Sequence, residues 1–253
     1  MRQLDQFRRR AARYLEIEAV TVTPARGVFS LSFDDFPESA WSVAGPILAD
    51  HGVLATYYVC GGLERGTNLD LPQFTTEQLQ ELHAAGHEVG CHTFGHDSVL
   101  RLDGPALADS LDRNARWVAE RLDGYRMRTF AYPFGDASLG AKRILRDRFD
   151  LARGVREGLN LGREDRMLIK SFGMESRRLP GYDLPTMMGE AATNKGWLTA
   201  YAHDVSDQPT PYGCSPADLD RVLTLAKQAG LAILPMGQAW GDCVGQGRAS
   251  RAA

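Results

Sequence analysis

Phe29-Ser30-Leu31-Ser32-Phe33-Asp34-Asp35-Phe36-Pro37 has the pattern of a β-strand that carries two adjacent carboxylates at its carboxyl end. Apolar and small polar residues alternate as far as Phe33, and Pro37 ends the run. Neighbouring strand residues point to opposite faces, but the twist at a strand end lets Asp34 and Asp35 reach one cleft. Two carboxylates this close repel each other unless a cation lies beside them. The stretch therefore indicates a sheet strand that ends at a cation site.

Strand-like and helix-like segments alternate along the rest of the chain. Short apolar runs predict strands over residues 27–33, 53–59, 88–91, 128–132, 150–155, 197–202 and 231–234. Amphipathic spacing and capping residues predict helices over residues 38–51, 75–85, 104–122 and 138–148, and a further helix from Ser215 onward. About seven such repeats fit a barrel better than an open sheet. The sequence thus predicts an α/β fold with about seven parallel strands in a single domain.

The two ends of the chain differ from the alternating part, which gives three segments. Residues 1–26 form an N-terminal helical extension, residues 27–243 the barrel domain, and residues 244–253 a tail rich in Gly, Ala and Arg that we expect to be disordered. Apolar residues in the extension follow helical spacing, and we expect this helix to pack on the barrel rather than to lie on a membrane surface. These residues are Leu4, Phe7, Ala11, Tyr14 and Leu15.

The bulk composition is ordinary for a soluble globular protein and argues against several classes. A net charge of -3 and a pI near 6.1 give no reason to expect binding to nucleic acid or to an anionic membrane. We see neither a secretory signal nor a transmembrane helix, so we expect a cytoplasmic protein, with export by a non-classical route left open. The four cysteines are widely spaced and include no CxxC pair, which favours buried free thiols and a reducing compartment.

Several predicted strands end in residues that can carry chemistry. Asp34-Asp35, His92 with His96, Pro133-Phe134 and His203 all stand at carboxyl ends of strands. In parallel α/β folds these ends gather on one face, where active sites form. One carboxylate and two imidazoles make a facial set of metal ligands that leaves coordination positions open, as in catalytic sites. Each cluster alone also suits a helix cap or a surface loop, and their joint occurrence is what predicts a metal hydrolase.

Four motifs carry a resemblance to a known family. Leu-Ser-Phe-Asp-Asp (31–35), Gly-His-Glu-Val-Gly-Cys-His-Thr-Phe-Gly-His (86–96), Phe-Ala-Tyr-Pro-Phe-Gly (130–135) and Tyr-Ala-His-Asp (201–204) resemble, in this order, the motifs of the polysaccharide deacetylases, the family-four carbohydrate esterases. The resemblance runs from about Gly27 to Gly241. It implies a distorted (β/α) barrel that uses one divalent metal ion to hydrolyse N-acetyl groups on amino sugars, or in some members O-acetyl groups.

The resemblance assigns the metal ligands position by position. Asp35, His92 and His96 would hold the metal, and Thr93 would steady the histidine motif by hydrogen bonding. Zinc is the first choice, and cobalt, nickel or manganese suit the same donors. Cys91 lies beside a ligand, where we expect a buried thiol rather than a fourth ligand.

The resemblance also assigns the reacting groups. Asp34 would be the general base and His203 the general acid, because a departing amine needs a proton. The backbone N–H of Phe134 would stabilise the oxyanion. The side chains of Tyr132, Phe134 and Trp197 would line a cleft for an N-acetylated oligosaccharide or polysaccharide, although aromatic residues near strand ends are more often core.

Two positions depart from the family pattern. Family members commonly have an arginine two residues before the proline of the third motif, where it holds the base, and this chain has Ala131 there. Arg128 would point elsewhere if the strand is regular. The aspartate that tunes the acid histidine has no clear counterpart, and Asp183 and Glu175 are the candidates.

Two further interpretations stay open at this point. The chain could hydrolyse a different amide, such as a cyclic imide or ureide, since related barrels perform that chemistry. It could also be a catalytically impaired carbohydrate-binding homologue, which Ala131 would explain. The complete set of base, three ligands and acid favours the deacetylase, because a binding protein needs no such set.

Overall fold

The computed structural model describes residues 2–244, with side chains described from Asp5 onward, and its centre is a parallel sheet. Eight strands form this sheet in the order β10-β11-β2-β3-β6-β7-β8, and β12 pairs with β2. The strands are β2 (Val28–Asp35), β3 (Thr56–Val59), β6 (Glu88–Cys91), β7 (Thr129–Ala131), β8 (Leu151–Arg153), β10 (Phe172–Gly173), β11 (Trp197–Ala202) and β12 (Ala232–Ile233). Each of the seven predicted strands has a counterpart here, and β10 is added to them.

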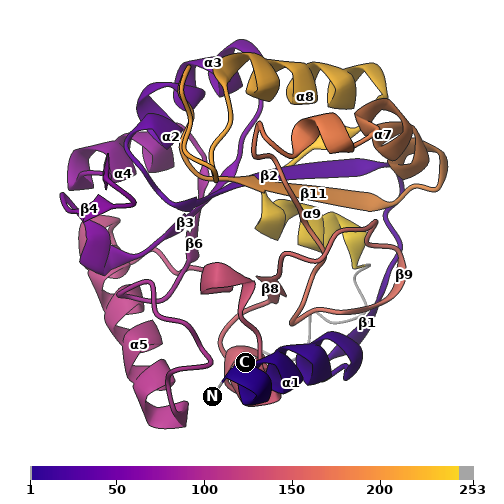
Figure 1. Cartoon of the computed structure of the whole chain (residues 1–253). Helices are drawn as coiled ribbons and strands as arrows, with labels where there is room; N and C mark the ends of the chain where they lie inside the picture. Colours follow the sequence, from indigo (N-terminus) through magenta and orange to yellow (C-terminus); the bar gives the residue numbers. More distant parts are fainter. Residues whose placement is uncertain (1, 245–253) are drawn as a thin grey trace.

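The sheet curls into a barrel and does not lie flat (Figure 1). A single parallel bridge between Arg153 of β8 and Ile169, which precedes β10, joins its two edges. The outer helices are α2 (Ser39–Ser42), α3 (Ala44–Asp50), α4 (Thr76–Ala84), α5 (Gly104–Arg121), α6 (Leu139–Leu145), α7 (Leu184–Thr193) and α8 (Pro216–Gln228). The predicted distorted (β/α) barrel in a single domain is confirmed.

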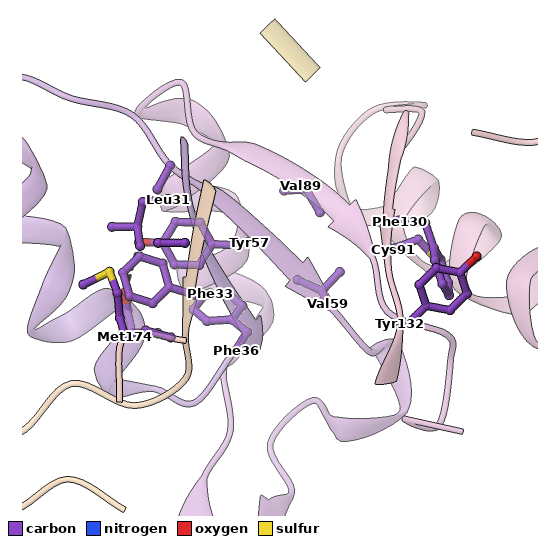
Figure 2. Close-up of a cluster of buried hydrophobic side chains, with 14 of the residues drawn as sticks. Leu31, Phe33, Phe36, Tyr57, Val59, Val89, Cys91, Phe130, Tyr132 and Met174 are labelled. Atoms are coloured by element: carbon purple, nitrogen blue, oxygen red, sulfur yellow. Dashed lines mark hydrogen bonds between the residues drawn. The ribbon is translucent and has the colours of Figure 1, made fainter. Parts of the chain in front are cut away.

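Both faces of the barrel strands are buried, as a sheet covered by helices requires. Along β2, Phe29, Leu31 and Phe33 belong to the large apolar layer between the sheet and the outer helices, part of which Figure 2 shows. Ser30 lies on the opposite face, in the lumen of the barrel, where its Oγ accepts a hydrogen bond of 2.9 Å from Trp197 Nε1. The alternation of the sequence is thus an alternation between two buried environments.

Helix α9 (Met236–Cys243) closes the lumen at the amino ends of the strands. Met236 packs against lumen residues, and its backbone N–H donates to Thr56 Oγ1 at the start of β3 over 2.8 Å. The next residue, Gly237, donates its N–H to Glu88 at the start of β6 over 2.8 Å. Because this end is sealed, the carboxyl ends of the strands form the accessible face.

Some elements were not predicted. The predicted helix over residues 38–51 is two helices, α2 and α3, and no helix was assigned where α7 and α9 lie. Two antiparallel pairs flank the barrel, namely β1 (Ala19–Val22) with β9 (Gly162–Asp165) and β4 (Thr67–Asn68) with β5 (Leu71–Pro72). The β1–β9 pair joins residues 19–22 of the predicted extension to the barrel domain.

The N-terminal helix α1 (Arg2–Tyr14) lies beside α6, but not on the expected apolar stripe. Phe7, Tyr14 and Leu15 are 69%, 73% and 54% exposed, whereas Ala12 is fully buried. Leu4 lies outside the described side chains. Small alanines let the helix backbone approach the barrel, and polar contacts from Lys142 hold it there, so the large apolar residues of the stripe face outward.

Other expectations concern the thiols, the tail and the membrane. All four cysteines are buried and free, as expected. Of the predicted disordered tail, residues 245–253 lie outside the described part of the chain. Among residues 2–244, no helix is both long enough and apolar enough to cross a bilayer.

Candidate metal centre and active site

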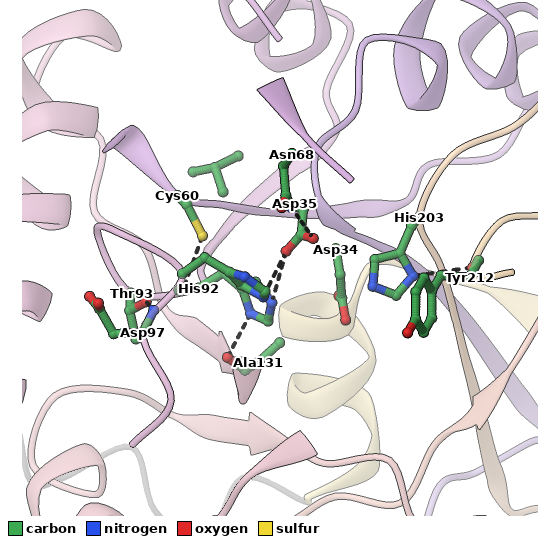
Figure 3. Close-up of polar contacts among 12 residues, drawn as sticks. Asp34, Asp35, Cys60, Asn68, His92, Thr93, Asp97, Ala131, His203 and Tyr212 are labelled. Carbon is green, nitrogen blue, oxygen red and sulfur yellow. Dashed lines mark hydrogen bonds and ion pairs between the residues drawn. The ribbon is translucent and has the colours of Figure 1, made fainter. Parts of the chain in front are cut away.

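The centre of the site is the buried carboxylate of Asp35, which is 2% exposed at the end of β2. Its Oδ1 lies 3.4 Å from His92 Nε2 and 3.1 Å from His96 Nε2, as Figure 3 shows. Its Oδ2 accepts a hydrogen bond of 2.8 Å from Asn68 Nδ2. Oδ1 is buried and has no hydrogen-bond partner within the described residues. An orphaned oxygen that faces two ring nitrogens is what a cation site leaves when only the protein atoms are considered.

The backbone around the site turns sharply to bring these side chains together. Asp35, Thr93 and His96 all adopt positive φ angles, of 63°, 63° and 56°. Such angles cost energy in residues other than glycine, and they cluster at functional sites. Thr93 Oγ1 accepts a hydrogen bond of 2.8 Å from the backbone N–H of Asp97, which holds the loop between the two histidines. Thr93 therefore steadies the histidine motif through a contact of the kind that was predicted.

A hydrogen bond to the backbone selects the tautomer of His92. Its Nδ1 lies 2.8 Å from the carbonyl oxygen of Ala131 at the end of β7. A carbonyl can only accept, so Nδ1 carries the proton and Nε2 presents a lone pair toward Asp35. This is the state in which an imidazole binds a metal ion.

The electrostatics of the three groups also suit a cation. Burial opposes ionisation of Asp35, but the neighbouring imidazoles of His92, His203 and His96 outweigh it and hold the pKa of this carboxyl below its usual range. Burial and the neighbouring His92 lower the pKa of His96 to about 4. At neutral pH the group is therefore one carboxylate with a neutral His96, which is the protonation state that ligands need.

Three ligand atoms, one each from Asp35, His92 and His96, lie within 4.8 Å of one another and could hold a divalent ion. The nearby thiols do not join this group. Cys60 Sγ donates to the backbone oxygen of His92 at 3.0 Å, and Cys91 Sγ accepts from Asn114 Nδ2 at 3.2 Å. Burial raises the pKa of Cys91 to about 11, which keeps it a thiol. The expectation that Cys91 is not a fourth ligand agrees with this geometry.

Asp34 lies beside the metal group but has a partner of its own. Its carboxylate is 4% exposed, and both oxygens lie 2.6 Å from Nη2 of Arg153. Arg153 is fully buried in the lumen, with its guanidinium 5.3 Å from the ring of Tyr58 and 4.9 Å from that of Tyr201. The aromatic walls and the ion pair fix the direction of the Asp34 carboxylate.

Arg153 contacts Asp34 from the strand beside β7, although residue 131 itself is an alanine. Residues 131 and 153 are paired neighbours in the parallel ladder of β7 and β8. The methyl side chain of Ala131 leaves space through which an arginine on β8 can reach across the lumen. Sequence reasoning missed this residue, although a lone arginine between Leu151 and Val155 in a predicted buried strand was a signal. Arg128 pairs with half-buried Asp150 instead, so it does point elsewhere.

His203 lies on the far side of Asp34 from the metal group, as Figure 3 shows. Its Nδ1 is 3.2 Å from the backbone oxygen of Tyr212. Neither of the two suggested carboxylates is its partner. Asp183 caps the start of α7 by accepting from the N–H of Thr186, and Glu175 contacts Arg178 at 3.4 Å. Both candidates are therefore corrected, because Asp183 caps a helix, Glu175 lies against Arg178, and neither has a described hydrogen bond or ion pair with His203.

Of the three aromatic residues predicted to line the cleft, only Phe134 is exposed. Its ring is 65% exposed and lies 4.4 Å from the ring of His96. Tyr132 is 1% exposed and donates its hydroxyl to Met167 O, and Trp197 is fully buried in the lumen. The placement of Tyr132 and Trp197 in a substrate cleft is therefore corrected: both are core residues, and Figure 2 includes Tyr132.

Comparison with known proteins agrees with the fold and the motifs. The family model described as polysaccharide deacetylase matches residues 21–148, half of the chain. A chitin deacetylase from a Pestalotiopsis species is 28% identical over 92 residues, which are 36% of this chain and 29% of that protein. The chain thus spans less than a third of the length of this curated relative.

Solved structures share the fold at low sequence identity. A peptidoglycan N-acetylglucosamine deacetylase, Bc1960, superimposes with a TM-score of 0.58 at 16% identity, over 87% of this chain and 91% of that one. A CE4-family pseudoenzyme from Bacillus anthracis superimposes with a TM-score of 0.56 at 16% identity, over 87% of this chain and 67% of that one. Enzymes and a pseudoenzyme share this fold, so the fold alone does not decide activity.

Proposed function

Because the chain belongs to the polysaccharide deacetylase family, we propose that it is a metal-dependent hydrolase that removes acetyl groups from an amino-sugar glycan or glycan precursor. The bond broken is the amide of an N-acetyl group. The proposed metal ligands are Asp35, His92 and His96, with zinc as the metal and cobalt, nickel or manganese as possible substitutes. The proposed base is Asp34 and the proposed acid is His203.

One observation carries this proposal. The Oδ1 atom of Asp35, which has no described hydrogen-bond partner, faces Nε2 of both His92 and His96. A second carboxylate, that of Asp34, lies beside them and is paired with Arg153. A purely structural metal site would have closed its coordination with a fourth protein ligand. Three ligands next to an independently held carboxylate leave positions for water and for a substrate oxygen.

The chemistry assigned to the chain's own residues is a hydrolysis by one water molecule. A divalent ion in this group supplies a Lewis acid for the amide oxygen and lowers the pKa of water. Asp34 takes a proton from the attacking water, and Arg153 holds its carboxylate in place. His203 gives a proton to the nitrogen as the C–N bond breaks, so that acetate and a free amine result. The N–H of Phe134 is the proposed donor to the oxyanion.

Arg153 also bears on the interpretation as an impaired binding protein. That interpretation rested on Ala131, which stands where family members commonly have the arginine that holds the base. The ion pair between Arg153 and Asp34 supplies a replacement from the next strand. The alanine at position 131 is therefore no argument against turnover at this site.

The proposal is tested by metal analysis of the purified protein and by acetate release from N-acetylglucosamine oligomers. We expect about one divalent ion per chain, and we expect chelation to abolish acetate release and added zinc to restore it. Stoichiometric metal with no acetate released would contradict the proposed function. Cyclic imides and ureides serve as alternative substrates in the same assay.

Two variants separate the roles of the acids and histidines. Asp34→Asn should lower turnover by about a thousandfold and keep the metal, because the amide cannot take a proton from water. His92→Ala should lose the metal and the activity together. Metal content and initial rates measure both effects. If Asp34→Asn lost the metal instead, the assignments of Asp34 and Asp35 would be reversed.

A further inference from the structure

The proposed acid is held by the backbone rather than by a carboxylate. His203 Nδ1 lies 3.2 Å from the carbonyl oxygen of Tyr212. A carbonyl oxygen can only accept, so this contact places a proton on Nδ1 and leaves Nε2 as the nitrogen that gives or takes the catalytic proton. In Figure 3 the ring nitrogen away from Tyr212 is the one on the side of Asp34. The orientation of the His203 ring therefore depends on the position of the backbone carbonyl of residue 212.

The carboxylate of Asp204 fixes that backbone. Asp204 is 1% exposed and directly follows His203. Its Oδ2 accepts the N–H of Thr210 at 2.9 Å, and its Oδ1 accepts the hydroxyl of Thr210 at 2.5 Å. Thr210 Oγ1 in turn accepts the N–H of Tyr212 at 3.2 Å. A chain of hydrogen bonds thus leads from the buried carboxylate to the residue whose carbonyl holds His203.

Gly213 lets the loop close on the carboxylate. A Cβ at position 213 would lie 2.3 Å from Oδ1 of Asp204, closer than any real contact. The N–H of Cys214 donates to the backbone oxygen of Asp204 at 3.0 Å, and the carbonyl of Gly213 accepts from the N–H of Ser176 at 3.0 Å. Residues 204–214, which we call the acid loop, are therefore anchored at both ends and at Thr210.

We propose that Asp204 is a positioning residue for the general acid, acting through Thr210 and the acid loop on the orientation and tautomer of His203. The inference rests on the proposed function. The loop carbonyl takes the place of the tuning carboxylate that the sequence does not supply. Loss of this support leaves Nδ1 without its acceptor, so the ring can rotate or adopt the other tautomer. Only the protonation of the leaving group then suffers, since Asp34 and the metal ligands do not contact the acid loop through any described hydrogen bond.

The kinetic test compares two classes of substrate. An N-acetyl amide needs a proton on its departing nitrogen, whereas 4-nitrophenyl acetate releases a stable phenolate without one. Asp204→Ala should lower kcat on N-acetylglucosamine oligomers at least about tenfold, with KM and the rate on the ester within about twofold of the wild type. Gly213→Ala should shift the ratio of the two rates in the same direction. His203→Ala removes the proposed acid altogether, so it should give the largest change in the ratio of the amide rate to the ester rate.

Controls separate positioning from general damage. Asp207→Ala removes an exposed carboxylate from the same loop and should leave both rates unchanged. Asp204→Asn, the conservative variant, can still accept from the N–H of Thr210 and should retain more amide activity than Asp204→Ala. Equal losses on amide and ester in Asp204→Ala, or no loss on either, would overturn the proposal.

A second measurement does not depend on activity. The ¹⁵N shifts of His203, assigned by comparison with His203→Gln, report which ring nitrogen carries the proton in neutral imidazole. We expect the Nδ1–H form in the wild type and a shift toward the Nε2–H form in Asp204→Ala. An Nε2–H wild type, or an unchanged tautomer in the variant, would refute the positioning role. If the wild type released no acetate but the tautomer changed as expected, the proposed function would fail while the positioning role of Asp204 stood.

Discussion

Asp34 and Asp35 are neighbours in the chain, but their surroundings give them different chemistry. Asp35 faces two imidazoles, and one of its oxygens is left for a cation. Asp34 faces a guanidinium, which holds both of its oxygens at 2.6 Å. This ion pair fixes the direction of the Asp34 carboxylate and keeps it apart from the group around Asp35. The local partners therefore fit the proposed division of one acidic pair into a ligand and a base.

The role of Arg153 gives a prediction at this scale. Arg153→Met removes the described ion-pair partner that fixes the direction of the Asp34 carboxylate in the lumen. We expect kcat to fall by about a hundredfold at pH 7 with the metal retained, because a carboxylate that is no longer held can turn away from the attacking water. Initial rates and metal content measure both effects.

Arg128→Met is the matched control, because it removes an exposed arginine that directly precedes β7 and pairs with half-buried Asp150. It should change neither the rate nor the metal content. Full activity in Arg153→Met would show that Asp34 does not need the guanidinium, and the assignment of the base would then lack its support.

At the scale of elements, the sequence predicted the positions of the strands more accurately than the contacts of their side chains. The alternation in β2 and the histidine motif after β6 are local patterns, so the strands and the ends that carry the ligands could be predicted. Two-residue β10 forms only because β11 lies beside it, and no local signal shows it. Tyr132 was misplaced because the side that a residue faces depends on strand register, which the sequence does not fix.

Contacts across the barrel also could not be predicted from local sequence patterns. Arg153 and Asp34 are 119 residues apart in the chain and meet only because the sheet curls. The acceptor of His203 is a backbone carbonyl, which any residue at position 212 would supply, so no residue type marks it. For the same reason the search for a carboxylate partner led to Asp183 and Glu175, which have other partners.

His87, between α4 and β6, makes the fold sensitive to acid. It is 6% exposed, its Nδ1 accepts the N–H of Ala55 at 3.1 Å, and its ring packs edge-on against Trp41 and Tyr57. Burial lowers its pKa from 6.5 to about 4. The unfolded chain therefore binds a proton at a higher pH than the folded chain does.

The sign of the effect follows from this order of protonation. As pH falls from about 6.5 to 4, the unfolded state gains a proton first, so the free energy of unfolding decreases, by about 3 kcal/mol over the whole window. His87→Asn keeps an acceptor for Ala55 but cannot titrate, so its stability should fall less between pH 7 and pH 5. Urea unfolding at both pH values measures the difference, with His51→Asn, at a half-buried histidine paired with exposed Asp220, as the control. An unchanged pH dependence in His87→Asn would contradict this account.

At the scale of the whole molecule, a buried lysine joins the N-terminal helix to the barrel. Lys142 of α6 is 1% exposed, and its Nζ donates to Asp165 Oδ2 at 2.8 Å, to Leu15 O at 3.2 Å and to Ala12 O. Asp165 in β9 also accepts the N–H of Ile17 at 3.0 Å. The Lys142–Asp165 ion pair thus connects the end of α1, the segment that leads into β1, and helix α6 on the outside of the barrel.

This arrangement predicts unequal costs for two similar changes. Asp165→Asn leaves the ammonium of Lys142 buried with carbonyl partners alone, and removing one partner of a buried pair costs about 3–5 kcal/mol in the free energy of unfolding. Glu16→Gln breaks only the surface pair with Arg163, whose side chain is 74% exposed, and should cost less than about 1 kcal/mol. Urea unfolding measures both. The double variant Lys142→Met/Asp165→Asn should recover part of the larger loss, because no charge is then left unpaired, whereas additive losses would mean that the two side chains act separately.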